Sequence, residues 1–524
     1  MHITLIAPPW YFKDEDEARE SLSQNLGLGY IAAYLRNHGH QVLIIDALAY
    51  GKDRFSRLNI GKQTVCQKGL LPKDITNLIP ANTNLIGISI PFSNMAHVAK
   101  ELSAAIKNRF PKIPLVLGGV YPSTSPQKAL TADVDYLVRG EGEIPMLNLA
   151  NKLEPENIKG LFFRSKSGLV DNGQSEVISN LDDIPFPARD LMMMNEYLEF
   201  SPRRERGKRT LSIITSRGCP FDCNFCSVHP VCGYKWRARS PENVIAEIKE
   251  GMEKYKVNHV EFEDDNLTLD IDRAAAIFDS LIALPEKITW SAHNGVRIDR
   301  LDEQLIKKFK KSGCLRLNLA VESGNKELLD KMNKKLDLKK VEEIVKICGK
   351  LGIYTSAFLL IGFPGETKES FKETIKFVRK LKRLGLSKTS PFIVNPYPGT
   401  NLYEYCKINN YLKADAEEHI YFLDDYVGIT TEDFSEKDVI EWWHEAFNLN
   451  YPASKYFKKL KILKGMIKKL LPSKIQNKLW SLANRFFQDL ANKACIASLL
   501  EVFRSIDHTQ KFLSKQRYPT ASAI

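Results

Sequence analysis

The sequence lacks any long apolar run. Within its 524 residues, no hydrophobic stretch approaches the roughly 18–20 residues that a membrane-spanning helix needs. The first nine residues show no basic region with a small-residue cleavage site. They have the pattern of a β-strand, so we expect no signal peptide. A composition of 44% hydrophobic and 26% charged residues is typical of a soluble globular protein. The length predicts about two to four domains, and we expect a cytoplasmic location.

Excess positive charge is missing from most of the chain. Residues 451–524 hold 15 of the 75 basic residues and 3 of the 63 acidic ones, which leaves 60 of each sign in residues 1–450. Because that body has no basic groove pattern, we expect no nucleic-acid partner. In the tail, lysines are mixed with apolar and aromatic residues. This predicts amphipathic helices that either bind an anionic membrane surface or pack as a cap on the preceding domain.

Cysteine is sparse and scattered, with one exception. The nine cysteines include Cys219, Cys223 and Cys226, which are spaced C-x3-C-x2-C. Without a secretory signal, such thiols are expected to bind metals or to lie in cores. A [4Fe–4S] cluster normally takes one thiolate per iron, so three thiolates would leave one iron open. Cys232 lies close by, and we expect it to be an ordinary buried thiol.

The same cysteines permit a zinc site as an alternative. His229 could act as a fourth ligand beside the three thiolates, which is a common set of zinc ligands. The strand and helix pattern that follows the cysteines favours the iron–sulfur interpretation.

Residues 1–150 predict a doubly wound parallel sheet of the α/β class. Apolar strands alternate with helices, with strands at 2–7, 41–46, 84–91, 114–119 and 135–139 and helices at 27–37, 96–109 and 143–152. Such sheets bind ligands at the carboxyl ends of their strands. Glycines follow two of these ends, and a missing side chain lets backbone approach a bulky ligand. No G-x-G-x-x-G follows the first strand, so a dinucleotide site is not supported.

The remainder of the body predicts a second α/β domain. Residues 151–205 form an irregular connector with a small hairpin between Gly160 and Gly173. Between residues 206 and 410, six strands alternate with helices, and the first strand ends just before the cysteines. This pattern predicts a partial TIM-type (β/α)6 barrel, with its site at the carboxyl ends of the strands. Residues 411–450 are expected to extend the barrel, and residues 451–524 to form the helical basic tail.

Taken in order, these motifs resemble the class B radical S-adenosylmethionine (SAM) enzymes, which carry a cobalamin-binding domain. The resemblance covers roughly residues 1–410, and Phe225 supplies the aromatic residue that precedes the last cysteine in the family signature. It implies that Cys219, Cys223 and Cys226 hold a [4Fe–4S] cluster whose open iron binds SAM. Reductive cleavage of SAM would give a 5′-deoxyadenosyl radical. A one-electron reductant such as flavodoxin or ferredoxin is implied as a partner.

The resemblance also assigns cofactor positions. By this resemblance, groups after three barrel strands would hold SAM: Glu263, Asp264 and Asp265 at its amino group, Glu322 and Ser323 at its ribose, and Ile361, Gly362 and Glu366 near its adenine. Strand-end residues of the first sheet would surround cobalamin: Pro8, Leu26, Gly27, Ser89, Gly118, Gly119, Ser123, Gly140, Glu141, Gly142 and Glu143. The cobalamin-binding motif D-x-H-x-x-G of mutases and methionine synthase is absent. The resemblance therefore implies cobalamin without a histidine ligand beneath the cobalt.

The implied function is methylation of an unactivated carbon in a small-molecule or lipid-linked substrate. One SAM would yield the radical and another would remethylate cobalamin. A non-methylating radical reaction, such as the cyclisation by the anaerobic magnesium-protoporphyrin monomethyl ester cyclase, is an alternative. A cobalamin or iron–sulfur sensor without catalysis is another, although the intact triad argues against it. No second cysteine triad exists for an auxiliary cluster, which disfavours methylthio transfer. The residues that transfer protons stay unassigned.

Overall fold

The computed structural model describes residues 1–13, 22–60, 63–200, 207–413 and 426–450. Residues Met1–Ala446 form one compact unit. The basic tail, for which the sequence predicts amphipathic helices, lies outside the described residues. Across the described ranges, no helix has both the length and the hydropathy needed to cross a bilayer.

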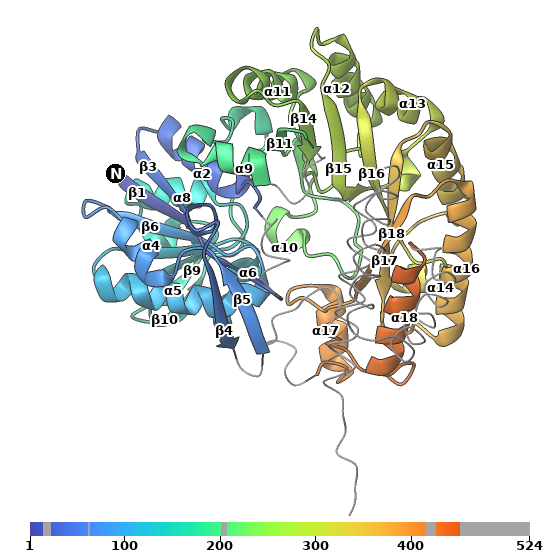
Figure 1. Ribbon diagram of the computed structural model, residues 1–524. Helices are drawn as coiled ribbons and strands as arrows, with labels where there is room; N and C mark the ends of the chain where they lie inside the picture. The colour runs from blue at the N-terminus through green and yellow to red at the C-terminus, as the bar shows by residue number, and fades with distance from the viewer. Residues whose placement is uncertain (14–21, 61–62, 201–206, 414–425, 451–524) are drawn as a thin grey trace, which may run out of the picture. The chain divides into compact units, whose positions relative to one another are not determined.

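The first half of this unit is built on a seven-stranded sheet (Figure 1). The strand order is β10-β9-β8-β7-β6-β1-β3. The parallel strands are β1 (His2–Ala7), β3 (Gln41–Asp46), β6 (Leu85–Ser89), β7 (Leu115–Gly118) and β8 (Tyr136–Val138). Helices cover both faces: α2 (Leu26–Asn37) and α8 (Glu143–Ala150) on one, α4 (Pro72–Leu78) and α5 (Ala96–Arg109) on the other. The predicted doubly wound sheet is confirmed.

The apolar character of these strands follows from burial on both faces. In β1, Ile3 and Leu5 point into the core that includes α2 and α8, whereas Ile6 points into the core that includes α4 and α5. A strand that buries alternate residues in two different cores must be apolar at nearly every position. Short helices complete the connections: α3 (Ala47–Tyr50), α6 (Val120–Thr124), α7 (Pro126–Ala129) and α9 (Met194–Phe200).

Two antiparallel features extend this half beyond what the sequence indicates. The hairpin of β9 (Leu161–Ser165) and β10 (Gly168–Asp171), predicted as part of the connector, pairs with β8 and lengthens the sheet. A separate three-stranded sheet has the order β2 (Trp10–Phe12), β5 (Gln63–Lys68) and β4 (Phe55–Ile60). Both features depend on hydrogen bonding between separate segments of the chain. Local sequence patterns do not indicate which segments pair.

The second half is the predicted six-stranded parallel barrel sheet, in the order β11-β14-β15-β16-β17-β18. The strands are β11 (Thr210–Ile213), β14 (His259–Phe262), β15 (Thr289–Val296), β16 (Cys314–Glu322), β17 (Tyr354–Ile361) and β18 (Lys388–Ile393). The helices that alternate with them lie outside the strands in Figure 1: α11 (Pro241–Tyr255), α12 (Ile271–Ala283), α13 (Glu303–Lys311), α14 (Lys326–Lys331), α15 (Leu338–Lys350) and α16 (Lys368–Leu384).

Two further helices follow the last barrel strand. These are α17 (Asn401–Ile408) and α18 (Glu436–Asn448). The Trp443 indole donates to the carbonyl oxygen of Pro391 in β18 at 3.0 Å. The Trp442 ring stacks on Phe371 of α16, with 5.1 Å between ring centroids. The α18 helix therefore packs on the β18 end of the barrel, within the predicted extension.

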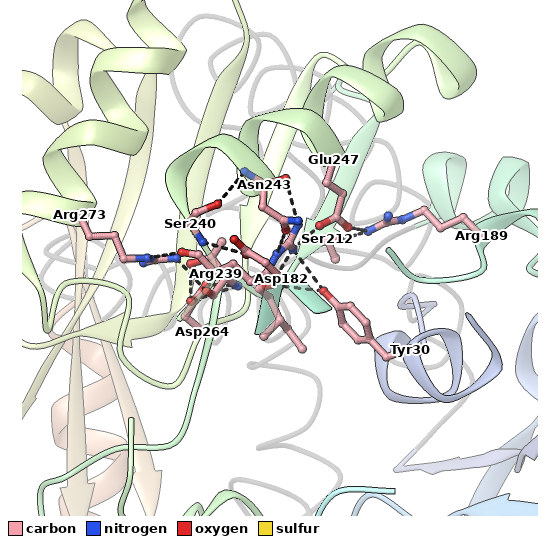
Figure 2. A network of polar contacts seen from close by, with 12 residues as sticks. Tyr30, Asp182, Arg189, Ser212, Arg239, Ser240, Asn243, Glu247, Asp264 and Arg273 are labelled. Carbon is pink, nitrogen blue, oxygen red and sulfur yellow. Dashed lines mark hydrogen bonds and ion pairs between the residues drawn. The ribbon is translucent and has the colours of Figure 1, made fainter. Parts of the chain in front are cut away.

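A buried network of charges joins the two halves (Figure 2). Glu247 of α11 accepts from Arg189 of the connector at 2.6 Å and from Arg239. Arg189 also donates to the carbonyl oxygen of Ser212 in β11 at 2.9 Å, and Arg239 also donates to the Tyr30 hydroxyl of α2. Burial alone would raise the pKa of Glu247, but the two arginines outweigh it and hold the pKa below its ordinary value.

Replacing Glu247 with Ala should destabilise the protein strongly. The substitution leaves two buried guanidinium groups without their carboxylate, a change that costs roughly 3–5 kcal/mol. We expect a lower midpoint of thermal unfolding by circular dichroism. Glu250→Ala on the same helix is the control, because Glu250 pairs with Lys254 in a solvent-exposed ion pair, and such pairs contribute little to stability. Equal effects of the two substitutions would contradict this account.

Candidate functional site

The three cysteines lie on a loop that is closed by a short ribbon. Strand β12 (Ser216–Arg217) pairs antiparallel with β13 (Arg237–Ala238), with Arg217 opposite Arg237. Gly218 starts the loop at φ 83°, where an added Cβ would lie 2.6 Å from the Lys235 carbonyl oxygen. Only glycine fits there without strain. The loop also carries the short helix α10 (His229–Cys232).

The thiols of this loop are free, half-buried and close enough to influence one another. Burial, together with the neighbouring thiols of Cys223 and Cys219, raises the pKa of Cys226 to about 12. Burial also raises the pKa of Cys223, while the positive charges of Lys334 and Arg297 oppose that shift. Three free thiols on one loop, with two cations nearby, suit an anionic iron–sulfur cluster.

The zinc alternative is not supported by the position of His229. Its Nε2 atom lies 3.1 Å from the Cys219 carbonyl oxygen, and its ring stacks on Tyr234 with 3.8 Å between centroids. Across the described ranges, no group of three or more His, Cys, Asp or Glu side chains is arranged to hold a single metal ion. Thiolates around a cluster bind different iron atoms, so they need not converge on one point.

The acidic residues after β14 divide into two roles. The Asp264 carboxylate accepts from the Thr215 hydroxyl at 2.7 Å and from the Ser216 hydroxyl at 2.5 Å, so it braces the strand that leads into the cysteine loop. Asp265 accepts from the Gly218 amide at 3.0 Å, and Glu263 and Asp265 both line the main cavity. Of the three residues predicted to hold the SAM amino group, Glu263 and Asp265 are therefore the better placed.

The predicted ribose position holds a buried ion pair. Glu322 ends β16 in the left-handed region, at φ 64°, and accepts from Lys334 at 2.9 Å. Ser323 is buried, and its hydroxyl lies 3.0 Å from that of Thr374. The sequence indicated Glu322 but not Lys334, which lies on the segment after α14.

The predicted adenine loop is held together by its own carboxylate. Glu366 is buried and accepts from the Gly362 amide at 2.6 Å, next to the buried Ile361. An added Cβ at Gly362 would lie 3.0 Å from Val439 of α18, so this glycine packs tightly. Burial raises the pKa of Glu366 to about 8. The Glu366 side chain therefore points into the protein and fixes the conformation of the loop through the Gly362 amide.

A cavity of about 280 Å³ lies between the strand ends of the first sheet and the cysteine loop. Of the positions predicted for cobalamin, those that line it are Gly27, Ser89, Gly118, Gly119, Gly140, Glu141, Gly142 and Glu143. The cysteine loop and the barrel also contribute to its wall, through Ser216, Arg217, Val231, Cys232, Glu263 and Asp265. The cavity accommodates only part of a ligand as large as cobalamin.

Three predicted cobalamin residues are not among those that line this cavity. Ser123 accepts from the Gly140 amide at 3.0 Å and so supports the lining from behind. Leu26 is buried in a small apolar cluster with Leu181 and Ile184. Pro8 is buried after β1. None of the three residues lines the cavity itself.

The cavity fits a ligand that approaches the backbone closely. An added Cβ at Gly118 or Gly27 would meet only one neighbouring atom, at 3.9 Å in each case, so a side chain there would project into free space. Gly119 is different, because an added Cβ would lie 2.5 Å from the Ile90 carbonyl oxygen and its φ is 106°. Two glycines thus leave room for the ligand, and one permits the turn.

Two arginines that the sequence did not single out fix the cysteine loop beside this cavity. Arg217 donates to Glu141 and to Glu143, each at 2.8 Å, and lies 5.0 Å from the Tyr30 ring centroid. Arg237 also pairs with Glu141. All four charged groups are largely buried. Each arginine therefore needs its carboxylate partner, and the geometry of the hydrogen bonds fixes how the side chains are oriented. The sequence offered one indication of this role, because Arg217 lies two residues before the first cysteine of the triad.

Comparisons with known proteins match both halves of the chain. The model of the radical SAM superfamily matches residues 213–378, and the model of the B12 binding domain matches residues 18–150. The first model includes the cysteine loop and barrel strands β14 to β17, and the second includes the strand ends that line the cavity.

Several relatives align over most of the chain. An uncharacterized methyltransferase of Pyrococcus horikoshii is 31% identical over 394 residues, which are 74% of this chain and 79% of that protein. Cytidylyl-2-hydroxyethylphosphonate methyltransferase of Streptomyces wedmorensis is 29% identical, over 76% of this chain and 80% of that protein. Anaerobic magnesium-protoporphyrin IX monomethyl ester cyclase of Rubrivivax gelatinosus is 25% identical, over 92% and 84%.

A solved structure shares the fold. The radical S-adenosylmethionine methyltransferase TsrM from Kitasatospora setae, with cobalamin and a [4Fe–4S] cluster bound, has a TM-score of 0.61 at 19% identity and covers 76% of each chain.

Side chains placed at Gly118 should block the cavity in proportion to their size. Gly118→Ala should retain cobalamin, whereas Gly118→Leu should bind it at least roughly tenfold more weakly, because overpacking costs about 1–3 kcal/mol. The measurement is cobalamin retained per chain after gel filtration, read from its absorption. Iron content should stay unchanged, because the thiols are elsewhere. Full cobalamin retention by Gly118→Leu would show that the cofactor lies outside this cavity.

Glu366→Gln should change the pH dependence of stability. The pKa of Glu366 rises from 4.5 in the unfolded chain to about 8 in the folded protein, so the folded state holds the proton more tightly. The free energy of unfolding contributed by Glu366 is therefore highest below pH 4.5 and falls as the pH rises toward 8. Relative to wild type, Glu366→Gln should gain thermal stability between pH 6 and pH 8. A difference that does not vary with pH would contradict a buried, protonated Glu366.

Three findings indicate the same family. They are the strand-end cavity, the cysteine loop at the mouth of the barrel, and the alignments over both halves of the chain. The cofactors that these features fit are a [4Fe–4S] cluster, SAM and cobalamin. The chain belongs to the cobalamin-dependent radical SAM enzymes, a family that includes methyltransferases.

Proposed function

We propose that this enzyme transfers a methyl group to an unactivated carbon of a small-molecule substrate, with Cys219, Cys223 and Cys226 as the ligands of its [4Fe–4S] cluster. The observation that carries the proposal is the shared cavity. Its wall combines strand-end glycines of the first sheet with Arg217, Cys232 and Asp265 of the second half. A ligand of the sheet and a ligand of the cysteine loop would therefore face the same space.

The chain's own residues would then bind and orient the cofactors. Gly27 and Gly118 leave space for cobalamin, and Glu263 and Asp265 present carboxylates and carbonyls that suit the SAM amino group. When bound, the cluster supplies an electron for the cleavage of SAM, and cobalamin supplies the methyl group. The Arg217 and Arg237 ion pairs hold the two sites in a fixed relation, which is what a transfer between two bound groups requires.

The relatives support methyl transfer but include a competing reaction. The proteins from Pyrococcus horikoshii and Streptomyces wedmorensis are named as methyltransferases. The Rubrivivax gelatinosus relative is named as a cyclase and aligns over 92% of this chain. A non-methylating radical reaction at the same site is therefore the second candidate, and product analysis separates the two.

Removing any one triad thiol should abolish SAM cleavage. We expect anaerobically reconstituted wild-type enzyme to show iron–sulfur absorption and to convert SAM to 5′-deoxyadenosine with dithionite. Cys219→Ala, Cys223→Ala and Cys226→Ala should each lower 5′-deoxyadenosine formation by about a hundredfold or more, because an iron without its thiolate leaves the cluster incomplete. Cys232→Ala is the matched control and should retain cleavage. A triad variant with wild-type cleavage would refute the assignment.

The two candidate reactions differ in their second product. Methyl transfer forms S-adenosylhomocysteine when cobalamin is remethylated, so with substrate its amount should rise in step with 5′-deoxyadenosine. A cyclisation consumes SAM without forming S-adenosylhomocysteine. Incubating the cobalamin-loaded enzyme with candidate substrates and quantifying both products by mass spectrometry decides between them. Substrate-dependent 5′-deoxyadenosine without S-adenosylhomocysteine would contradict methyl transfer.

A further inference from the structure

A lysine-rich segment, residues 326–340, lies directly against the cysteine loop. The Asn224 amide donates to the Met332 carbonyl oxygen at 3.1 Å, and the Asn224 side chain donates to the Lys331 carbonyl oxygen at 2.7 Å. In return, the Asn333 side chain donates to the Asp222 carbonyl oxygen at 2.7 Å. Both partners on the cysteine loop lie next to Cys223. The segment is thus held against the loop at the residues on either side of the middle cysteine.

A buried arginine continues this contact toward the surface. The Arg297 guanidinium lies 3.5 Å from the ring centroid of Phe221, in the cysteine loop. Its Nη2 atom donates to the Lys335 carbonyl oxygen at 3.4 Å. The Lys335 side chain itself is exposed. A short series of contacts therefore runs from the cysteine loop through Arg297 to an exposed lysine.

The outer side of the segment carries positive charge that is only partly neutralised. Residues 326–340 hold six lysines and three acidic residues, whereas residues 1–450 as a whole are electrically balanced. Lys326 pairs with Asp330, but Lys335 and Lys339 form no ion pair within the part of the chain that the structure describes. These lysines surround a hollow of about 520 Å³, lined by Lys326, Lys335, Leu336, Asp337, Leu338 and Lys339.

We propose that residues 326–340 are the docking surface for an acidic one-electron carrier protein that reduces the cluster. The proposal rests on the proposed cluster at Cys219, Cys223 and Cys226. In the step, one electron leaves the carrier and enters the cluster, so the carrier is oxidised by one electron and the cluster is reduced by one. No atom is transferred. Exposed lysines steer an acidic partner electrostatically, and a surface in contact with the cysteine loop keeps donor and acceptor close.

The test is a charge reversal at Lys335 and Lys339. Lys335→Glu combined with Lys339→Glu removes positive charge without breaking a side-chain hydrogen bond or ion pair among the described residues, and a glutamate near the start of α15 is compatible with the helix dipole. The control combines Lys249→Glu of α11 with Lys311→Glu of α13, two exposed lysines that form no ion pair within the described residues. Both variants change the net charge equally.

Each cluster-loaded protein is reduced anaerobically with either flavodoxin or dithionite. With flavodoxin, the Lys335/Lys339 variant should show an apparent KM for the carrier raised roughly tenfold, a slower loss of cluster absorption and weaker binding by flavin fluorescence. The control should match wild type. Added salt should weaken flavodoxin binding to wild type more than to the variant. With dithionite, a small reductant, all three proteins should form 5′-deoxyadenosine equally.

Three results would overturn the proposal. Equal flavodoxin dependence of the variant and wild type would mean that the carrier docks elsewhere. Loss of activity with dithionite as well would mean that Lys335 and Lys339 support the cysteine loop rather than a partner. Failure of wild type to form 5′-deoxyadenosine with dithionite would remove the proposed cluster, and with it the need for a donor. The dithionite measurement therefore separates failure of the docking surface from failure of the proposed function.

Discussion

The arrangement of this enzyme depends on two buried arginines that clamp the cysteine loop to the first sheet. Arg217 and Arg237 face each other across the ribbon that closes the loop, and both bind Glu141. Glu141 belongs to the turn after β8, where an added Cβ at Gly140 would lie 2.5 Å from the Ser175 hydroxyl. The loop that holds the thiols is therefore anchored to the strand ends that line the cavity. Removal of one partner would leave an uncompensated buried charge, so these side chains depend on one another.

A second buried network, next to β11, also joins the two halves. Arg189 of the connector and Arg239 just before α11 share the Glu247 carboxylate, and Arg239 reaches the Tyr30 hydroxyl. Tyr30 also lies against Arg217, so one side chain of α2 touches both networks. The two networks therefore hold the first sheet and the barrel at a constant separation. The connector contributes to this network through Arg189.

Local patterns predicted most of the elements, because the buried strands are apolar throughout and the helices alternate with them at regular spacing. The triad and the strand-end glycines were found for the same reason: their spacing is local. The β2-β5-β4 sheet and the addition of β9 and β10 to the main sheet were not predicted, because strand pairing is a long-range property. Nor could the sequence show that Asp264 and Glu366 turn inward, or that Lys334 pairs with Glu322. Side-chain partners depend on tertiary contacts that a linear pattern does not contain.

The central claim is that cluster and cobalamin occupy neighbouring sites that face one cavity. Electron paramagnetic resonance of enzyme holding both cob(II)alamin and the reduced cluster tests it most directly, since both are paramagnetic. If the two sites are neighbours, we expect the two signals to split each other and to relax fast. Pulsed measurements should then give a short distance between the two spins. A spectrum that is the plain sum of the two separate signals would contradict the account.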